Sequence, residues 1–301
     1  NPLEEGINPR AYENSIKAKV CDIIRYILPA GTLTAMGFAF NARTAEHAIN
    51  KLLSHPSTEA RELGNRLLEE GSKICPTLLK FAKFNPYMDE TAKKMMELSS
   101  TILKKGVQTT LSGTGVPKQE DLIPVKTICV DEDAEDKVIA AILYEYGQQN
   151  YNDVLSAVKK LSKEDKENIF DEYLKRRGAF DRPMRALEYA FFTTEIVCDY
   201  GAFRDIQRHR MNTQTNPLFT THLGYEIPDE ITEIGNQSLG NDSLIKGINV
   251  KDEYVKAMEK AKALFEKLEQ KYPYEAQYII PLAFRKRVLF KWNIRELEHF
   301  I

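Results

Sequence analysis

The sequence predicts an α+β fold that contains two related copies of one unit. Apolar residues recur at helical spacing in several segments, as at Ile16 and Val20 within residues 10–28. Other segments have the alternating or aromatic and β-branched composition of strands, such as residues 32–40 and 187–198. The third observation is a long internal repeat.

The repeat aligns residues 24–49 with residues 276–301 without a gap, and nine of the 26 positions are identical. The identical pairs are Tyr26/Tyr278, Ile27/Ile279, Pro29/Pro281, Phe38/Phe290, Asn41/Asn293, Arg43/Arg295, Glu46/Glu298, His47/His299 and Ile49/Ile301. Both copies show the same order: an amphipathic helix, a proline, an alternating strand, and an N-x-R sequence that opens a helix. This shared order predicts a duplicated unit, although its period is longer than that of solenoid repeats.

The repeat sets the expected domain boundaries. Residues 1–103 are predicted to be the C-terminal half of a first copy, whose front part would precede residue 1. Residues 125–301 are predicted to be a second copy, truncated at its C-terminus. Residues 104–124 are rich in Thr, Ser, Gly and Lys and lack a hydrophobic period, so we expect a linker there.

The elements of the first copy follow from caps and helix breakers. A helix over residues 10–28 should stop at Pro29, and an alternating strand should cover residues 32–40. The remaining expected elements are helices: one opening at Asn41 or Thr44, one from Ser57 or Thr58 to about Lys73, and a short one after Pro76.

The second copy should begin with a strand and continue with a mixture of helices and strands. The expected elements are a strand at 125–130, a helix at 133–147, a charged surface helix at 153–177, a strand at 187–198, an element through Phe203 and Ile206, a long loop at 211–248 and a helix capped by Asn249. The closing strand and helix are those of the repeat.

Composition excludes several functional classes. The 301 residues are 43% hydrophobic and 29% charged, with a net charge of −2, so there is no global electrostatic case for nucleic acid or a membrane surface. No signal peptide and no apolar run of transmembrane length is found, which predicts a soluble, cytoplasmic protein. The four cysteines (Cys21, Cys75, Cys129 and Cys198) form no CxxC pair, so we expect buried reduced thiols and no metal site.

The main candidate site is the triplet Arg208, His209 and Arg210, which ends an element where the chain enters a loop. Guanidinium groups bind phosphate bidentately, and loop amides add donors, so the triplet suits an anion. The alternative is a solvated or salt-bridged charge cluster. His47 and His299 are expected to pair with neighbouring turns, and the basic face with Arg285 and Arg287 is expected to be solvated.

This arrangement resembles the flavin-dependent thymidylate synthase family. That family has an R-H-R triplet followed by serine after seven residues, an A-R-x-x-L-P segment and an N-x-R sequence. The matching residues are Arg25, Leu28, Pro29, Asn41 and Arg43 in the first copy, and Glu188, the triplet, Asn293 and Arg295 in the second. The resemblance implies an antiparallel-rich sheet with long flanking helices.

The resemblance also implies an activity, which is the reductive methylation of dUMP to dTMP. FAD would be bound, and NADPH and methylenetetrahydrofolate would be co-substrates. The implied cofactor contacts are Arg208, His209, Arg210, Asn293, Arg295, Asn41 and Arg43, and the implied substrate contacts are Arg25 and Arg210. Because the family's site is assembled between subunits, a homo-oligomer is expected.

Some positions depart from the family pattern. Leu218 stands where the family has serine, and Asn216 and Thr220 stand at neighbouring glutamate and arginine positions; these positions hold dUMP in the family. In the second copy Gln277 replaces the arginine that the first copy keeps as Arg25. A leucine donates no hydrogen bond. Three functions therefore stay open: an active synthase, a flavin- or nucleotide-binding protein without methyl transfer, and a structural part of a larger assembly.

Overall fold

The computed structural model describes residues 8–106, 123–235 and 249–301. The chain forms two compact units that interleave along the sequence. Unit 1 comprises Asn1–Tyr26, Pro117–Lys251 and Leu282–Ile301, and unit 2 comprises Ile27–Val116 and Asp252–Pro281.

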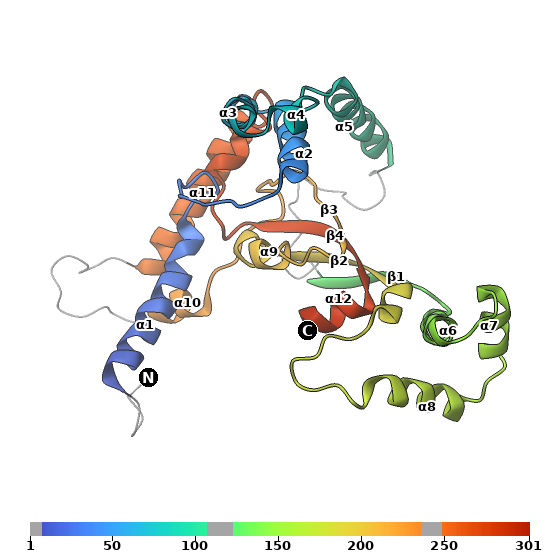
Figure 1. The fold of residues 1–301 in the computed structure, drawn as a ribbon. Coiled ribbons are helices and arrows are strands. Elements are labelled where there is room, and N and C mark those ends of the chain that lie inside the picture. Colours follow the sequence, from blue (N-terminus) through green and yellow to red (C-terminus); the bar gives the residue numbers. More distant parts are fainter. Residues whose placement is uncertain (1–7, 107–122, 236–248) are drawn as a thin grey trace. The chain divides into compact units, whose positions relative to one another are not determined.

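Unit 1 is built on a four-stranded antiparallel sheet with the order β1-β2-β4-β3 (Figure 1). Its strands are β1 (Val125–Val130), β2 (Phe191–Asp199), β3 (Thr213–Thr215) and β4 (Arg285–Asn293). The two central strands, β2 and β4, pair along their whole length, from Phe191 opposite Asn293 to Asp199 opposite Arg285. The predicted α+β class with an antiparallel sheet is confirmed.

Alternation along β4 determines which side chains enter the core. Val288, Phe290 and Trp292 are buried, whereas Arg287, Leu289 and Lys291 between them are exposed. This is the period of two expected of a strand with one face in the core. The buried indole of Trp292 donates a hydrogen bond to Thr194 Oγ1 on β2 at 2.9 Å.

Helices accompany the sheet in unit 1. They are α1 (Pro9–Ile24), α6 (Ala134–Tyr146), α7 (Tyr151–Val158), α8 (Lys163–Leu174), α9 (Tyr200–Ile206), α10 (Asp229–Gly235) and α12 (Ile294–Phe300). A 3-10 helix at Arg185–Tyr189 leads into β2. Its Ala186 and Leu187 pack with Val138 and Ile142 of α6, so this short helix is anchored just ahead of the central strands.

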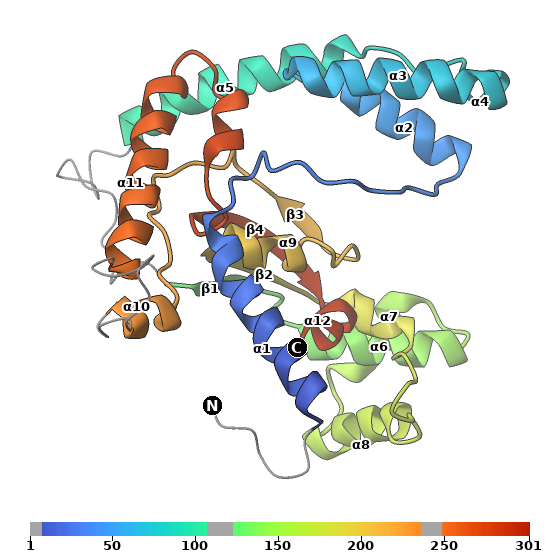
Figure 2. The same ribbon diagram turned by 90° about the vertical axis from the view of Figure 1, so that its left-hand side faces the viewer.

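Unit 2 is helical. It contains α2 (Ala42–Leu53), α3 (Thr58–Ile74), α4 (Pro76–Leu79), α5 (Pro86–Gly106), nearly all of α11 (Val250–Leu268) and a 3-10 helix at Glu275–Ile279. Figure 2 shows α2 and α3 side by side, and Ile49 and Leu53 of α2 share a buried cluster with Leu79 of α4. None of the helices in the described parts of the chain is long and apolar enough to cross a membrane.

Most of the expected elements are confirmed, and four need correction. The charged segment 153–177 is two helices, α7 and α8, because the Ser162 hydroxyl caps a new helix by accepting from the Asp165 amide at 3.1 Å. The strand predicted at 187–198 begins only at Phe191, after the 3-10 helix. The predicted loop 211–248 contains β3 and α10, and its residues 236–248 lie outside the described residues, as does most of the predicted linker.

The strand predicted at residues 32–40 is the clearest error. This segment has no regular secondary structure, and in Figure 2 it runs as a bare trace into α2. A strand exists only through hydrogen bonds to a neighbour, and no described strand pairs with this segment.

The expectation of four buried thiols was also wrong in part. All four cysteines are free, but Cys21 and Cys129 are exposed.

Candidate functional site

A cavity of about 1160 Å³ lies within unit 1, where the ends of several elements meet. Three segments line it: residues 177–183 between α8 and the 3-10 helix, residues 205–211 after α9, and residues 295–300 of α12. The predicted triplet Arg208, His209 and Arg210 lies in the second segment. The cavity also contains Arg295, which brings the N-x-R sequence to the triplet.

The backbone of the triplet is held by side chains from two other elements. The Gln214 side-chain amide on β3 donates to the carbonyl oxygens of Gln207 at 3.2 Å and His209 at 2.9 Å. The Asn293 amide donates to the Met211 carbonyl at 2.9 Å, and its Oδ1 accepts from the Glu296 amide at 2.8 Å. Asn293 therefore caps α12 and fixes the residue that follows the triplet.

Three of the arginines in the cavity are neutralised by carboxylates. Arg208 pairs with Asp205 at 2.5 Å, Arg177 with Glu298 at 2.7 Å, and Arg295 with Glu188 at 2.8 Å. These partners come from the same or neighbouring segments, so the three guanidinium groups are oriented before any ligand binds.

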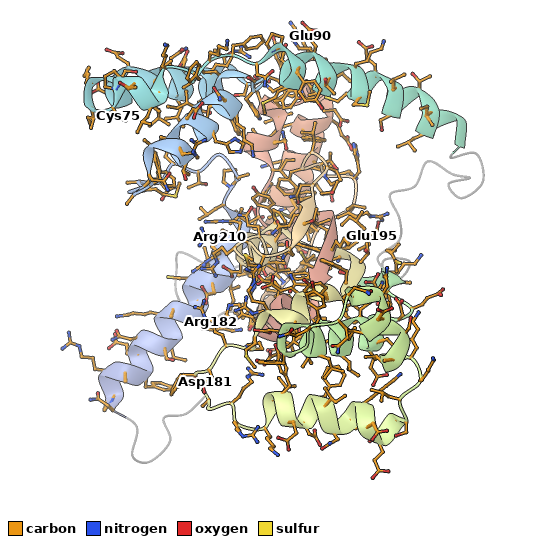
Figure 3. The ribbon with its side chains drawn as sticks, turned by 45° about the vertical axis from the view of Figure 1, so that its right-hand side comes forward. Cys75, Glu90, Asp181, Arg182, Glu195 and Arg210 are labelled. Atoms are coloured by element: carbon orange, nitrogen blue, oxygen red, sulfur yellow. The ribbon has the colours of Figure 1, made fainter. Side chains whose placement is uncertain are left out.

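Two arginines of the cavity, Arg182 and Arg210, have no carboxylate within ion-pair distance among the described residues. Figure 3 labels both, together with Asp181. Both side chains are exposed. Among the described arginines of this cavity, these two are therefore available to pair with an anionic ligand.

His209 is the most enclosed member of the triplet. Its Nδ1 is buried and makes no hydrogen bond, although Glu296 Oε1 lies 3.4 Å away. Its ring lies 5.5 Å from that of His299 and 5.1 Å edge-on from Phe300. A buried polar nitrogen needs a polar partner, and the Glu296 carboxylate lies at ion-pair distance from it.

Glu188 connects the 3-10 helix to the cavity. It accepts hydrogen bonds from Arg185 Nη2 at 2.9 Å and from Arg295 Nη1 at 2.8 Å. The hydrogen bond from Arg185, followed by that from Arg295, lowers the pKa of Glu188 against the opposing effect of burial. The glutamate is therefore held as a carboxylate, and Arg295, which also donates to the Pro183 carbonyl at 2.7 Å, is fixed in place.

The other predicted site residues lie elsewhere. Arg25 pairs with Asp22 and does not line this cavity. Asn41 caps α2 by accepting from the Thr44 amide at 2.9 Å, and Arg43 follows it on the exposed side of α2 in unit 2. The structure groups the second-copy residues in one place and does not add the first-copy residues to them.

The prediction of a solvated basic face at Arg285 and Arg287 was half correct. Arg287 is exposed, but Arg285 is buried and pairs with Glu226 at 2.5 Å. A buried guanidinium needs such a partner because desolvation is costly. His299 and His47 were expected to pair with neighbouring turns. His299 lies at the cavity, and His47 is exposed on α2.

Sequence reasoning missed Arg177, Phe180 and Arg182. They lie in one short segment without a hydrophobic period, so no pattern marked them. The available signal was the density of arginine in residues 176–185, ahead of the recognised glutamate. Phe180 is fully exposed at the cavity. Among the described residues, no cluster of His, Cys, Asp and Glu could hold a metal ion.

The sequence matches the profile of the thymidylate synthase complementing protein (Thy1) family over residues 8–77 and 127–301. The chain belongs to this family, which is that of the flavin-dependent thymidylate synthases. The resemblance found in the sequence is thus confirmed.

Among curated proteins, the chain is 31% identical over 299 residues to a UPF0159 protein of Chlamydia muridarum and 32% identical over 298 residues to one of Chlamydia pneumoniae. Each match covers 99% of this chain and 53% of the relative. The UPF0159 protein Ta1429 of Thermoplasma acidophilum is 27% identical over 297 residues, 97% of this chain and 54% of that protein. The chain spans about half the length of these relatives.

Among solved structures, the chain resembles a UMP/dUMP methylase, PolB, from Streptomyces cacaoi, whose structure was determined with bound 5-Br dUMP. The sequence identity is 15%, the TM-score is 0.40, and the match covers 58% of this chain and 75% of the other. At this level of similarity the comparison carries no argument about the site.

Proposed function

We propose that the cavity around Arg208, His209 and Arg210 binds the phosphate groups of a flavin nucleotide. The observation that carries this proposal is a pair of guanidinium groups, Arg182 and Arg210. Both line one cavity, and neither has a carboxylate partner in the described part of the chain. Arginine without a carboxylate binds phosphate through two parallel hydrogen bonds, and FAD carries two linked phosphates.

Other features of the cavity fit FAD. Its volume of about 1160 Å³ is at the upper end of ordinary ligand sites. The exposed ring of Phe180 can stack on a flat heterocycle. Bound flavin would accept electrons from NADPH and pass them on in a reductive methylation.

Binding of FAD can be measured by flavin absorbance or fluorescence during titration of the purified protein. Replacement of Arg210 or Arg182 by alanine should weaken binding about tenfold or more, since a charged hydrogen bond contributes about 1.5–3 kcal/mol. Arg176→Ala is the matched control, because Arg176 pairs with Glu172 on α8 and does not line the cavity. Equal affinity of the wild-type protein and Arg210→Ala would disprove the proposal.

A second candidate function is the full reductive methylation of dUMP to dTMP with FAD, NADPH and methylenetetrahydrofolate. The observation in its favour is that Glu188, the triplet and Arg295, all part of the family pattern, meet at one place. The changes at Asn216, Leu218 and Thr220 argue for the narrower function at positions that hold dUMP in the family. Asparagine and threonine carry no charge where the family has glutamate and arginine, and the leucine side chain makes no hydrogen bond where the family has serine.

Release of tritium from [5-³H]dUMP in the presence of the three co-reactants separates the two functions. Tritium release would establish the synthase activity. A homo-oligomer, which the family implies, is a further proposal. Flavin binding without release would establish a binding protein. Absence of both would leave the third function, a structural part of a larger assembly.

A further inference from the structure

Residues 32–40 expose an apolar surface that folded proteins normally cover. Side-chain exposure reaches 94% at Leu33, 69% at Met36 and 74% at Phe38. The segment is extended and belongs to unit 2, and no described strand pairs with it. Contiguous exposed apolar residues of this kind mark an interaction site.

The segments on both sides of residues 32–40 have the same backbone structure as their repeat counterparts. In unit 2 the Gly31 amide donates to the Tyr278 carbonyl at 2.8 Å, and in unit 1 the Ala283 amide donates to the Tyr26 carbonyl at 3.1 Å. Tyr26 corresponds to Tyr278 in the repeat, and Gly31 corresponds to Ala283. The two bonds are therefore the same bond made twice, in opposite directions.

The helix that follows is also opened in the same way in each copy. Asn41 accepts from the amide of the third residue after it, Thr44, at 2.9 Å, and Asn293 accepts from Glu296 at 2.8 Å. The backbone angles of the two caps agree within about ten degrees, with φ and ψ of −76° and 164° at Asn41 and −87° and 162° at Asn293. Over residues 25–48 and their counterparts 277–300, the secondary structure thus differs only between these shared ends.

The counterpart of residues 32–40 is the central strand β4. Its inward residues Val288, Phe290 and Trp292 correspond to Met36, Phe38 and Phe40. Its exposed residues Arg287, Leu289 and Lys291 correspond to Ala35, Gly37 and Ala39. In the repeat alignment, the large side chains of residues 32–40 therefore correspond to the residues that are buried in β4. Unlike β4, residues 32–40 have no neighbouring strand among the described residues.

We propose that residues 32–40 form a strand equivalent to β4 when they pair with a strand equivalent to β2, supplied by polypeptide of the same protein outside residues 1–301. The relatives are long enough to supply it, since 47% of the Chlamydia proteins lies outside the match. Backbone pairing at an unpaired strand provides the affinity, and burial of the alternate side chains provides the specificity.

A second copy of this chain does not fit as well. The sheet order β1-β2-β4-β3 places β2 between two strands, so a second copy has no β2 edge to offer without opening its own sheet. A strand from outside these residues meets no such obstacle.

Hydrogen–deuterium exchange of the amides of residues 33–40 tests the proposal. The measurement compares the longer natural polypeptide with the 301-residue chain. In the longer protein these amides should exchange at least about 100-fold more slowly. Free exchange in the longer protein, or a natural protein that has nothing outside residues 1–301, would overturn the proposal. Protection in the 301-residue chain that rises with its concentration would assign the surface to a second copy and would also overturn it.

Two substitutions in the longer protein test which side chains of the proposed strand are buried. Phe38→Asp places a carboxylate at the position of buried Phe290 and should abolish the slow exchange. Ala39→Lys is the matched control, because the corresponding Lys291 is exposed on β4, and it should leave exchange unchanged. Equal effects of the two substitutions would contradict the proposed pairing. In the 301-residue chain neither change should alter exchange in this segment.

Discussion

Glu188 and Arg295 are joined by a hydrogen bond of 2.8 Å, although 107 positions separate them in the chain. The bond ties the segment ahead of β2 to the first turn of α12 at the edge of the cavity. Both side chains are largely buried, with 18% and 27% of their surface exposed. Removal of one partner from such an ion pair costs more than at the surface, because it leaves a partly buried charge without its counter-ion.

The first prediction concerns acid stability. The pKa of Glu188 lies below its ordinary value of 4.5 in the folded protein, first because of the hydrogen bond from Arg185. The resulting stabilisation is present above the unfolded pKa and is lost as pH falls through the folded pKa. Glu188→Gln should therefore lower the free energy of unfolding by about 1 kcal/mol at pH 7, and the difference should vanish in acid.

Urea unfolding followed by the fluorescence of Trp292 measures this effect, because it is the single tryptophan and is buried on β4. Glu172→Gln on α8 is a suitable control, since its partners Lys175 and Arg176 are exposed. A difference between wild type and Glu188→Gln that persists unchanged at pH 3 would show that the charge of Glu188 has no such role.

The second prediction separates the two tasks of Asn293. Asn293→Asp keeps the cap, since aspartate caps helices as well as asparagine does, but it removes the donor to the Met211 carbonyl. We expect a loss of about 1 kcal/mol in stability from the lost hydrogen bond to the Met211 carbonyl, with weaker flavin binding because the end of the triplet is released.

The repeat offers the control for this change. Among the described residues, the side chain of Asn41 makes only the cap, at an exposed helix start, so Asn41→Asp should be close to neutral. Thermal unfolding and flavin titration of both variants would check the prediction. If Asn41→Asp and Asn293→Asp behave alike, the contact with Met211 does not hold the triplet.

The third prediction concerns Asp199, which caps α9 by accepting from the Ala202 amide at 2.8 Å. Burial raises the pKa of Asp199, although that hydrogen bond opposes the shift. The folded state therefore holds the proton more tightly, and wild-type stability should rise relative to Asp199→Asn as pH falls through the folded pKa. Asp199→Asn should be at least as stable as wild type at pH 7, whereas Asp199→Ala should lose about 1 kcal/mol with the cap.

Denaturant unfolding of the two variants at pH 7 and pH 5 provides the measurement. The order of stability should be Asn above Ala at pH 7. A more stable alanine variant at pH 7 would show that the cap contributes nothing at this position.

The extent to which the fold was predictable is clearest at the two alternating segments. Residues 32–40 and 285–293 carry the same pattern, and the sequence predicts a strand for both. Only β4 is one, because strand formation depends on distant pairing that a local pattern does not contain. Helices such as α2 and α6 were predicted well, since their caps and periodicity are local.

The residues of the candidate site that belong to the family pattern could be predicted from the sequence. The triplet, Glu188 and Arg295 were recognised, and the structure brings them together. Arg182 was not recognised. It lies in a segment without a motif, and only the folded structure brings that segment to the cavity. That Asn293 serves both a cap and the triplet also follows only from tertiary contacts.

The last prediction concerns the close approach at Gly31. A Cβ atom at this position would lie 2.8 Å from the Cβ and 2.9 Å from the carbonyl oxygen of Tyr278. Because backbone cannot move aside as a flexible side chain does, Gly31→Ala should lower the stability of unit 2 by about 1–3 kcal/mol. It should also weaken the hydrogen bond from the Gly31 amide to Tyr278.

Gly37→Ala is the matched control, since nothing lies within 4 Å of a Cβ atom there. It should be neutral or slightly stabilising, because alanine reduces the freedom of the unfolded chain. Circular dichroism during urea unfolding reports on the helices of unit 2 and measures both variants. Unchanged stability of Gly31→Ala would mean that Gly31 does not lie as close to Tyr278 as the hydrogen bond between them requires.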